Sequence, residues 1–264
     1  MKVIAGAGLK YPGCGRTRGH MHDLSTRSVL VTGASSGIGE ATAHAVAAEG
    51  ASVALAARRE ERLDTIADAI ADAHGVPTRT LPTDIREEEQ VRRMVAESVD
   101  AFDGLDVVVN NAGLGRGSDV ESLTTEEYRQ MMATNVDGSF FTTRAALPHL
   151  AESRGNLVFV GSFAGQYPRP FNPVYAATKW WLRGFAHSVA AEVGEEGVAV
   201  SVVNPSEVRT EFGSEDGDPF EERFDAGEVT EPEEIADAIV FAARQDRSTV
   251  QELDLYRRDK FSGF

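Results

Sequence analysis

The chain has 264 residues, of which 42% are hydrophobic, enough to form one large domain around a single core. Acidic residues outnumber basic ones by 42 to 26, and the net charge of −16 opposes binding to nucleic acid or to an anionic membrane. No apolar run reaches the roughly 20 residues of a membrane-spanning helix, and the first residues lack the apolar stretch of a secretory signal. The lone Cys14 cannot form an internal disulfide. We therefore expect a cytoplasmic protein with no nucleic-acid or membrane partner.

The first 24 residues differ in composition from the rest. They contain five glycines, show no amphipathic period, and carry four basic residues against Asp23 alone. Met21 offers a second translation start just before the patterned sequence begins. We expect residues 1–24 to be a disordered extension that can be deleted without loss of stability, and residues 25–264 to form a single domain.

From Ser28 onward, short strands of Val, Leu and Ala alternate with amphipathic helices. We expect strands at 28–33, 52–57, 78–81, 105–110, 156–162 and 198–205, with a last strand within 249–258. We expect helices at 40–50, 60–73, 86–100, 125–151, 173–193 and 232–243. Continuous apolar strands that each lead into a helix indicate a parallel sheet covered on both faces. The sequence thus predicts a Rossmann-type, doubly wound α/β fold with its ligand at the carboxyl ends of the strands.

The first predicted strand leads into a glycine-rich turn, Thr32-Gly33-Ala34-Ser35-Ser36-Gly37-Ile38-Gly39, which then opens a helix. Glycines permit a tight turn and let the backbone approach a pyrophosphate, which the helix N-terminus stabilises. Glycines also form ordinary turns, but the strand–turn–helix context favours a dinucleotide site.

The end of the second strand predicts which dinucleotide binds. A carboxylate at this position commonly binds the ribose 2′-hydroxyl of NAD, whereas this chain has Ala57 followed by Arg58 and Arg59. A guanidinium suits the 2′-phosphate of NADP. The alternative is two solvated arginines at the start of a helix. We expect NADP(H), with Arg58 as the main determinant.

A tyrosine and a lysine occupy one face of the predicted helix 173–193. Tyr175 and Lys179 are four residues apart, and a nearby cation favours the phenolate form of tyrosine. Such a tyrosine can donate or accept a proton near neutral pH. Ser162 ends a strand thirteen residues earlier, where its hydroxyl could hold a substrate oxygen beside the phenol.

Together these motifs resemble the short-chain dehydrogenase/reductase superfamily, over about residues 25–256. Asn135 matches the family asparagine that holds a water in a proton relay, and Asp84 matches the aspartate that contacts adenine. Asn110-Asn111-Ala112-Gly113 is similar to the adenosine-side motif, and Asn204-Pro205-Ser206-Glu207-Val208-Arg209-Thr210 to the nicotinamide-side segment. Two positions depart from the family: Ser206 replaces a glycine, and Ser36 replaces a basic residue that marks NADP binding.

The resemblance implies a catalytic set and a cofactor site. The catalytic residues are Asn135, Ser162, Tyr175 and Lys179. The cofactor-binding residues are Gly33, Ser35, Ser36, Gly37, Ile38, Gly39, Arg58, Arg59, Asp84, Ile85, Asn111, Ala112, Gly113, Tyr175, Lys179, Pro205, Val208 and Thr210. The six histidines are scattered, so we expect no metal.

The expected reaction is hydride transfer between nicotinamide and a small-molecule alcohol/ketone pair. The resemblance is greatest to NADP-dependent dehydrogenases of 3-hydroxy acids, with a 3-oxoacyl-thioester reductase as the alternative and a non-catalytic NADP(H) sensor as a third reading. Between Thr210 and Glu231, Phe212, Phe220 and Phe224 either wall the substrate site or anchor a loop to the core. The family further implies a homotetramer or homodimer, with the helices that contain Trp180 and Trp181 between subunits or, alternatively, those tryptophans in the subunit core.

The charge balance leads to a first testable prediction. Residues 1–24 carry +3, so residues 25–264 carry −19, and only four of the 26 basic residues are lysines. This composition favours adaptation to a salty cytoplasm, as in a halophilic organism, and the alternative is an acidic mesophilic protein. Because molar salt reduces the screening length to about 3 Å, the melting temperature should rise steeply between about 0.1 M and 2 M KCl. Melting curves in KCl, repeated in sucrose to separate screening from surface exclusion, test this. A melting temperature that is flat above ~0.3 M KCl contradicts it.

Overall fold

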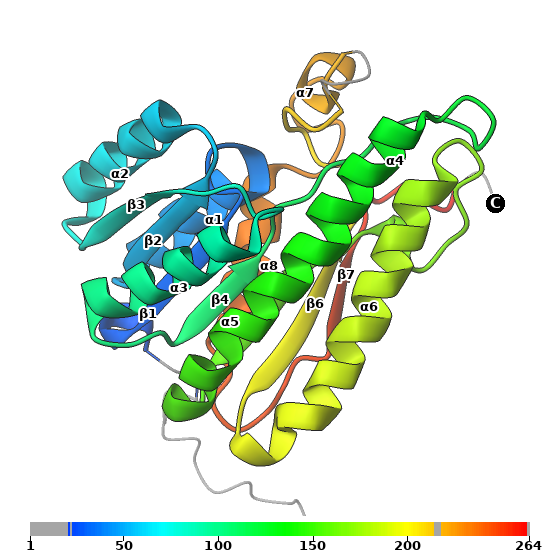
Figure 1. Cartoon of the computed structure of the whole chain (residues 1–264). Helices are drawn as coiled ribbons and strands as arrows, with labels where there is room; N and C mark the ends of the chain where they lie inside the picture. The colour runs from blue at the N-terminus through cyan, green and yellow to red at the C-terminus, as the bar shows by residue number, and fades with distance from the viewer. Residues whose placement is uncertain (1–20, 22, 214–217, 263–264) are drawn as a thin grey trace, which may run out of the picture.

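A seven-stranded parallel sheet forms the centre of the protein, with the strand order β3-β2-β1-β4-β5-β6-β7 (Figure 1). The computed structural model describes residues 21, 23–213 and 218–262. The strands are β1 (Ser28–Thr32), β2 (Ser52–Ala57), β3 (Thr78–Pro82), β4 (Val107–Asn110), β5 (Asn156–Val160), β6 (Ala199–Pro205) and β7 (Glu252–Leu255). All neighbouring strands are parallel. The predicted Rossmann-type fold is confirmed, as one domain.

Helices cover both faces of the sheet (Figure 1). Along β1, Val29 and Val31 face one layer and Leu30 faces the other, as the two-residue period of a strand requires. The first layer contains α1 (Gly37–Ala48), α2 (Glu60–His74) and α8 (Pro232–Ala243). The second contains α3 (Glu88–Phe102), α5 (Gly138–Ser153) and α6 (Pro173–Val193). Two separate apolar cores therefore fix the sheet from both sides.

The helix expected at 125–151 is divided into segments. It begins with α4 (Thr125–Met132), where the Thr124 side chain and Glu127 form a reciprocal capping box. A π-helical turn follows at Ala133–Asp137, and α5 continues from there. A π-turn inserts one extra residue and interrupts the regular hydrogen-bond ladder, which is frequent at functional sites. Asn135 lies within this turn.

The N-terminal boundary requires a correction. Leu24 is fully buried in the first core and belongs to a short 3-10 turn, Leu24–Thr26. The Asp23 carboxylate accepts a hydrogen bond from the Ser25 N–H and caps that turn. We expected that residues 1–24 could be deleted without loss of stability. This expectation is wrong for Leu24, because its side chain is part of the core. Residues 1–20 and 22 lie outside the described residues.

The strand order reverses direction between β1 and β4, since β2 and β3 lie on one side and β5, β6 and β7 on the other. The loops that follow β1 and β4 therefore diverge and leave a crevice at the carboxyl ends of the strands, the usual ligand site of such sheets. Among the described helices, none is both long and apolar enough to cross a membrane.

Candidate active site and cofactor groove

A groove of about 1180 Å³ follows the carboxyl ends of the strands. Its lining includes every candidate residue from the sequence except Gly39 and Asn135. Arg58 follows β2, on one side of the glycine-rich turn, whereas Ser162 follows β5 on the other side, where Tyr175 and Lys179 of α6 also line the groove. Residues more than 100 positions apart in the chain thus line one continuous groove, as the parallel topology predicts.

The glycine-rich turn is shaped for close backbone approach. Gly33 has φ +67°, and a Cβ added to it would lie 2.9 Å from the Ala112 Cα. A Cβ on Gly39 would lie 2.1 Å from the Gly33 carbonyl oxygen, so Gly39 packs the first turn of α1 against the loop. This explains why Gly39 does not line the groove. The turn leaves the N-terminus of α1 facing the groove, an arrangement that fits a pyrophosphate.

The loop after β4 is attached to the same turn. The Asn111 side chain donates to the Thr32 carbonyl oxygen at 2.9 Å, and the Asn111 and Ala112 N–H groups both donate to the Thr32 hydroxyl. Asn111 therefore holds the two sides of the crevice together. The expected adenine contact, Asp84, lies at the groove edge, where hydrogen bonds from Arg86 lower the pKa of its carboxyl group.

The arginines after β2 are arranged differently from each other. Arg58 is exposed at the groove. Arg59 folds back and donates to the Ser35 hydroxyl at 3.1 Å and the Ser36 hydroxyl at 2.9 Å. Across the groove, the Glu211 carboxylate pairs with Arg59 at 3.1 Å and also with Arg62. Sequence reasoning missed Arg62 and Glu211, because Glu211 is 152 positions from Arg59 and no motif connects them.

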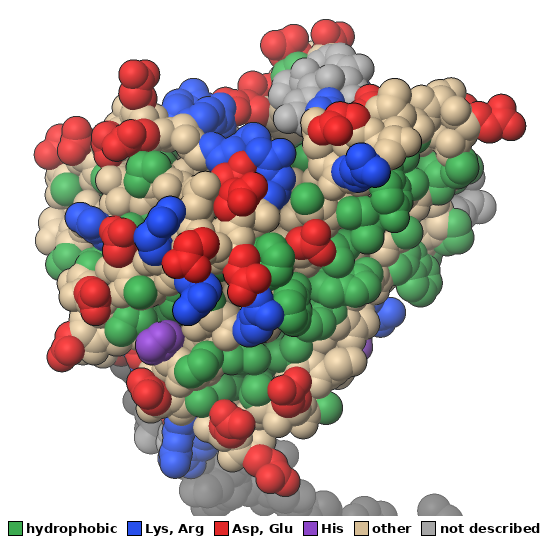
Figure 2. Space-filling view, in the orientation of Figure 1, with side chains coloured by type: hydrophobic (Ala, Val, Ile, Leu, Met, Phe, Trp, Pro, Cys, Tyr) green, Lys and Arg blue, Asp and Glu red, His purple; other side chains and the backbone are tan. Residues whose placement is uncertain are grey.

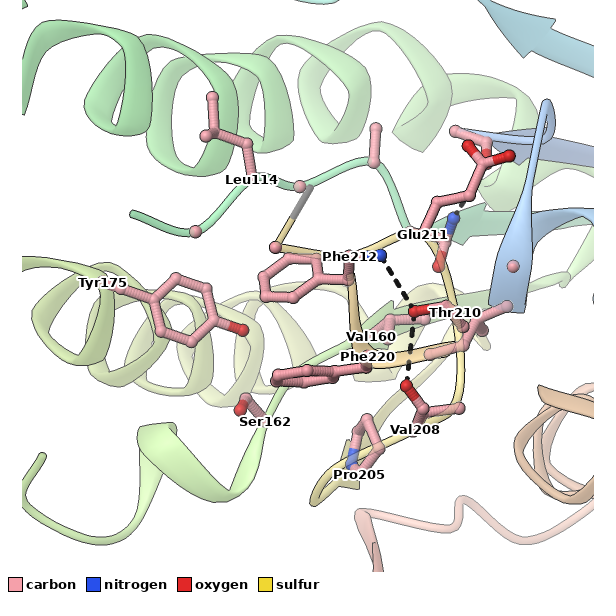
Figure 3. A pocket seen from close by; sticks show the side chains of 18 of the residues that line it. Leu114, Val160, Ser162, Tyr175, Pro205, Val208, Thr210, Glu211, Phe212 and Phe220 are labelled. Atoms are coloured by element: carbon pink, nitrogen blue, oxygen red, sulfur yellow. Dashed lines mark hydrogen bonds between the residues drawn. The ribbon is translucent and has the colours of Figure 1, made fainter. Parts of the chain in front are cut away.

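Lys179 is buried and holds helix α6 against the end of β5. Its Nζ donates to the Val160 carbonyl oxygen at 2.9 Å. Ser162 follows two residues later, and its hydroxyl accepts a hydrogen bond from the Ala164 N–H at 3.1 Å. The Tyr175 side chain points toward the same space as Ser162 and Phe220 (Figure 3). The predicted hydroxyl, phenol and ammonium are therefore brought together.

The proton affinities differ from the expectation. Burial lowers the pKa of Lys179 from 10.5 to about 8. Burial also raises the pKa of Tyr175, while a hydrogen bond from Ser162 and the charge of Arg169 act in the opposite direction. We expected Lys179 to lower the Tyr175 pKa, but the removal of the phenolate from water outweighs the effects of Ser162 and Arg169, which favour it. The phenol therefore stays protonated at neutral pH, the form that a proton donor needs.

The Asn135 side chain connects two segments of the site through hydrogen bonds. Its side-chain Oδ1 accepts from the Leu114 N–H at 2.8 Å, and its Nδ2 donates to the Leu114 carbonyl oxygen at 2.8 Å and to the Thr178 hydroxyl at 3.0 Å. The amide thereby connects the loop after β4 to helix α6, next to Lys179. Both polar atoms of the Asn135 side chain have hydrogen-bond partners within the protein, and these bonds fix the position of the loop relative to α6. The water-holding role stays a prediction.

Ser206 connects the loop after β6 to the C-terminal segment. Its N–H donates to the Leu255 carbonyl oxygen at 3.0 Å, and its hydroxyl accepts from the Arg257 N–H at 2.9 Å. The neighbouring Glu207 carboxylate pairs with Lys260, which lines the groove. The serine at this family glycine position therefore has a partner, and it anchors the loop to the chain after β7.

Aromatic side chains wall the groove beside Tyr175. The Phe212 ring lies 5.8 Å from the Tyr175 ring, Phe220 lies 5.9 Å from Phe212, and Phe224 lies 5.9 Å from Phe220, between centroids. Phe220 opens a short helix, α7 (Phe220–Arg223), which the sequence did not predict. Figure 3 shows Phe212 and Phe220 facing the space beside Tyr175. Of the two alternatives for these residues, the structure supports an apolar wall.

Comparisons with known proteins agree with this geometry. The family model described as short chain dehydrogenase matches residues 27–219. A glucose 1-dehydrogenase of Gluconobacter oxydans is 34% identical over 238 residues, covering 87% of this chain and 90% of that protein. The chain belongs to the short-chain dehydrogenase family, and it is an oxidoreductase of that family.

Solved structures give the same fold. An alcohol dehydrogenase from Thermococcus sibiricus, complexed with 5-hydroxy-NADP, has a TM-score of 0.81 and 31% identity, over 88% of this chain and 97% of that one. A 3-ketoacyl-(acyl-carrier-protein) reductase from Brucella melitensis, complexed with NADH, has a TM-score of 0.78 and 28% identity, over 86% and 96%. Members with this fold thus bind either dinucleotide.

The site generates a prediction for Tyr175. Tyr175→Phe removes the predicted proton donor and should reduce turnover by at least ~10²-fold while leaving dinucleotide binding nearly intact. Tyr128→Phe, on the exposed side of α4, is the matched control. Steady-state kinetics and fluorescence titration of the dinucleotide test this prediction. Near-normal turnover by Tyr175→Phe would exclude this residue as the donor.

The buried Lys179 predicts a pH dependence in the unaltered protein. The rate of ketone reduction should be constant below about pH 8 and fall above it, because Lys179 loses its proton there. Steady-state kinetics across this pH range measure it.

Proposed function

We propose that the protein is an NADP(H)-dependent oxidoreductase of alcohol/ketone pairs that acts on a 3-hydroxy acid or a related small hydroxy compound. The observation that carries the proposal is the meeting of Ser162, Tyr175 and Lys179 at one end of a groove whose other end is cationic. The bound nicotinamide would supply the hydride acceptor or donor. The chain's own residues hold the substrate oxygen and move its proton.

Each catalytic side chain has a distinct task in this proposal. Ser162 donates a hydrogen bond to the substrate oxygen and sets it beside the phenol. Tyr175 gives its proton to the ketone oxygen in reduction and takes it back in oxidation. Lys179 contributes a positive charge below its pKa of about 8. Asn135 keeps the loop after β4 and helix α6 in place.

The preference for NADP(H) rests on the charges at the far end of the groove. Arg58 and Arg59 line the groove, and Arg62 lies beside them, where the Glu211 carboxylate pairs with Arg59 and Arg62. The Asp84 carboxylate is paired with Arg86, so guanidinium groups outnumber carboxylates here. This local excess of positive charge favours a 2′-phosphate. Ser35 and Ser36 lie beside Arg59 and offer hydroxyl donors in place of the basic residue that the family commonly has.

A reductase of 3-oxoacyl thioesters is the second candidate, favoured by the likeness to the Brucella melitensis reductase. The apolar wall of Phe212, Phe220 and Phe224 would also accept an acyl chain. A non-catalytic sensor is disfavoured, since a sensor needs no proton donor and the complete set Ser162, Tyr175 and Lys179 is present.

We also propose that the chain forms a homodimer or homotetramer through α4, α5 and α6. Hydrophobic side chains gather over α5 and α6 in Figure 2, and Tyr128, Phe140 and Trp180 are exposed there at 45%, 38% and 47%. Trp181 instead stacks on Phe185 at 4.8 Å and belongs to the subunit core. A contiguous exposed apolar patch of this kind is typical of an interface. Light scattering in solution measures the assembly.

A substrate panel tests the proposed function. We expect turnover of 3-hydroxy acids, such as 3-hydroxybutyrate or allo-threonine, with NADP⁺, at a higher kcat/KM than simple secondary alcohols. Acetoacetyl thioesters with NADPH represent the second candidate, and both dinucleotides are run throughout. Preferred turnover of the thioester would select the second candidate. No turnover of any compound despite tight NADPH binding would contradict both and support the sensor.

The charges at the cofactor end predict two opposite effects. Arg58→Ala should reduce the preference for NADPH over NADH by roughly 10- to 150-fold, the value of a charge-assisted hydrogen bond of about 1.5–3 kcal/mol. Glu211→Gln should increase NADPH affinity by about 2- to 5-fold, because it removes a carboxylate from Arg59 and Arg62. Glu195→Gln, exposed near the start of β6, is the control. Equal use of both dinucleotides by the unaltered protein would refute the NADP assignment.

A further inference from the structure

Arg169 lies in the groove with no acidic partner among the described residues. Arginines elsewhere, such as Arg79 and Arg209, pair with nearby carboxylates, as expected in a chain with 42 acidic residues. Arg169 lines the groove, and its Nε is buried with no hydrogen-bond partner. A buried donor without a partner costs free energy, which a bound acceptor can recover. The unmatched guanidinium therefore indicates a ligand group of opposite charge.

Two aromatic rings hold this guanidinium in place. Its Cζ lies 4.4 Å from the centroid of the Phe171 ring and 5.5 Å from that of Phe163. Phe163 directly follows Ser162, so the guanidinium lies beside the turn that presents the Ser162 hydroxyl. The two rings cover part of the guanidinium and favour its charged form through their π-faces. An arginine fork held in this way suits a carboxylate, which it can bind through two hydrogen bonds.

The same guanidinium is near the reacting group. Burial raises the pKa of Tyr175 most strongly, and the hydrogen bond from Ser162 lowers it. The positive charge of Arg169 also lowers this pKa, because it favours the phenolate. Arg223, another arginine that lines the groove, lies over the Phe220 ring of α7 at 5.1 Å. Arg169, on the Ser162 side, is thus the better placed of the two for a group attached close to the reacting carbon.

A 3-hydroxy acid carries its carboxylate close to its hydroxyl group, which fits a guanidinium beside the Ser162 turn. In a 3-hydroxy acid, a single carbon separates the carboxylate from the carbon that bears the hydroxyl group. A hydroxyl held by Ser162 and Tyr175 would therefore keep the carboxylate near the same end of the groove, on the side of the Ser162 turn. The remaining substituent would face the wall of Phe212 and Phe220.

We propose that Arg169 binds the substrate carboxylate and makes this enzyme selective for hydroxy acids over neutral alcohols. This inference rests on the proposed function, since it assigns a specificity-determining residue to the same site. It names one anion, the carboxylate attached to the reacting compound.

The test compares an acid with its uncharged ester in two Arg169 variants. The substrates are 3-hydroxybutyrate and methyl 3-hydroxybutyrate, both enantiomers, with NADP⁺. Arg169→Met should lower kcat/KM for the acid by roughly 10- to 150-fold, mainly through KM, and change that for the ester by less than about 3-fold. Arg169→Lys should fall between the two. Arg93→Met, exposed on α3, removes the same charge outside the groove and should change neither.

A binding measurement separates recognition from chemistry. In the Tyr175→Phe holoenzyme, calorimetry should detect 3-hydroxybutyrate, and adding Arg169→Met should abolish that binding. Equal losses for acid and ester, or no loss for either, would overturn the proposal. Wild-type turnover of the ester but not of the acid would also overturn it and leave the oxidoreductase function standing. Absence of turnover with every alcohol and ketone would instead refute the proposed function itself.

Discussion

One buried hydrogen bond determines the geometry of the catalytic end: the ammonium of Lys179 on the carbonyl oxygen of Val160. Ser162 follows Val160 by two residues, and Tyr175 precedes Lys179 by about one helical turn, so this bond brings helix α6 and the end of β5 into register. Burial of this ammonium has a cost. A fall in pKa from 10.5 to about 8 corresponds to about 3 kcal/mol of bias against the charged form. The same burial places the ammonium 5.9 Å from the centre of the Tyr175 ring.

The second organising feature is the distribution of charge along the groove. The chain is strongly acidic as a whole, yet guanidinium groups lie at both ends of this one groove. Arg58, Arg59 and Arg62 face the end near the glycine-rich turn, and Arg169 faces the catalytic end. In an acidic protein, such positions attract small anions from solution and leave larger polyanions repelled by the surrounding surface. The Glu211 carboxylate connects the loop after β6 to Arg59 and Arg62.

Much of this could be predicted from the sequence. Continuous apolar strands, each followed by an amphipathic helix, predicted the parallel sheet, and every observed strand falls at a predicted position. Ser162, Tyr175 and Lys179 could be assigned because strand ends in a parallel sheet meet at one edge and residues four apart share a helix face. Other features depend on packing that no local pattern encodes. The contact between Glu211 and Arg59 joins distant loops, and the burial of Leu24 follows from its position under the sheet. The direction of the Tyr175 pKa likewise depends on how much water the folded chain excludes, which a spacing of four residues does not reveal.

The anchoring of Ser206 has a practical consequence. The loop after β6 is held by main-chain and side-chain contacts to Leu255 and Arg257, and Glu207 is held by Lys260. The last residues of the described chain therefore form part of the wall of the groove, although they come after the last strand of the sheet. A substitution at Arg257 or Lys260 would therefore disturb that wall. Engineering of this enzyme should treat its C-terminal segment as part of the active site.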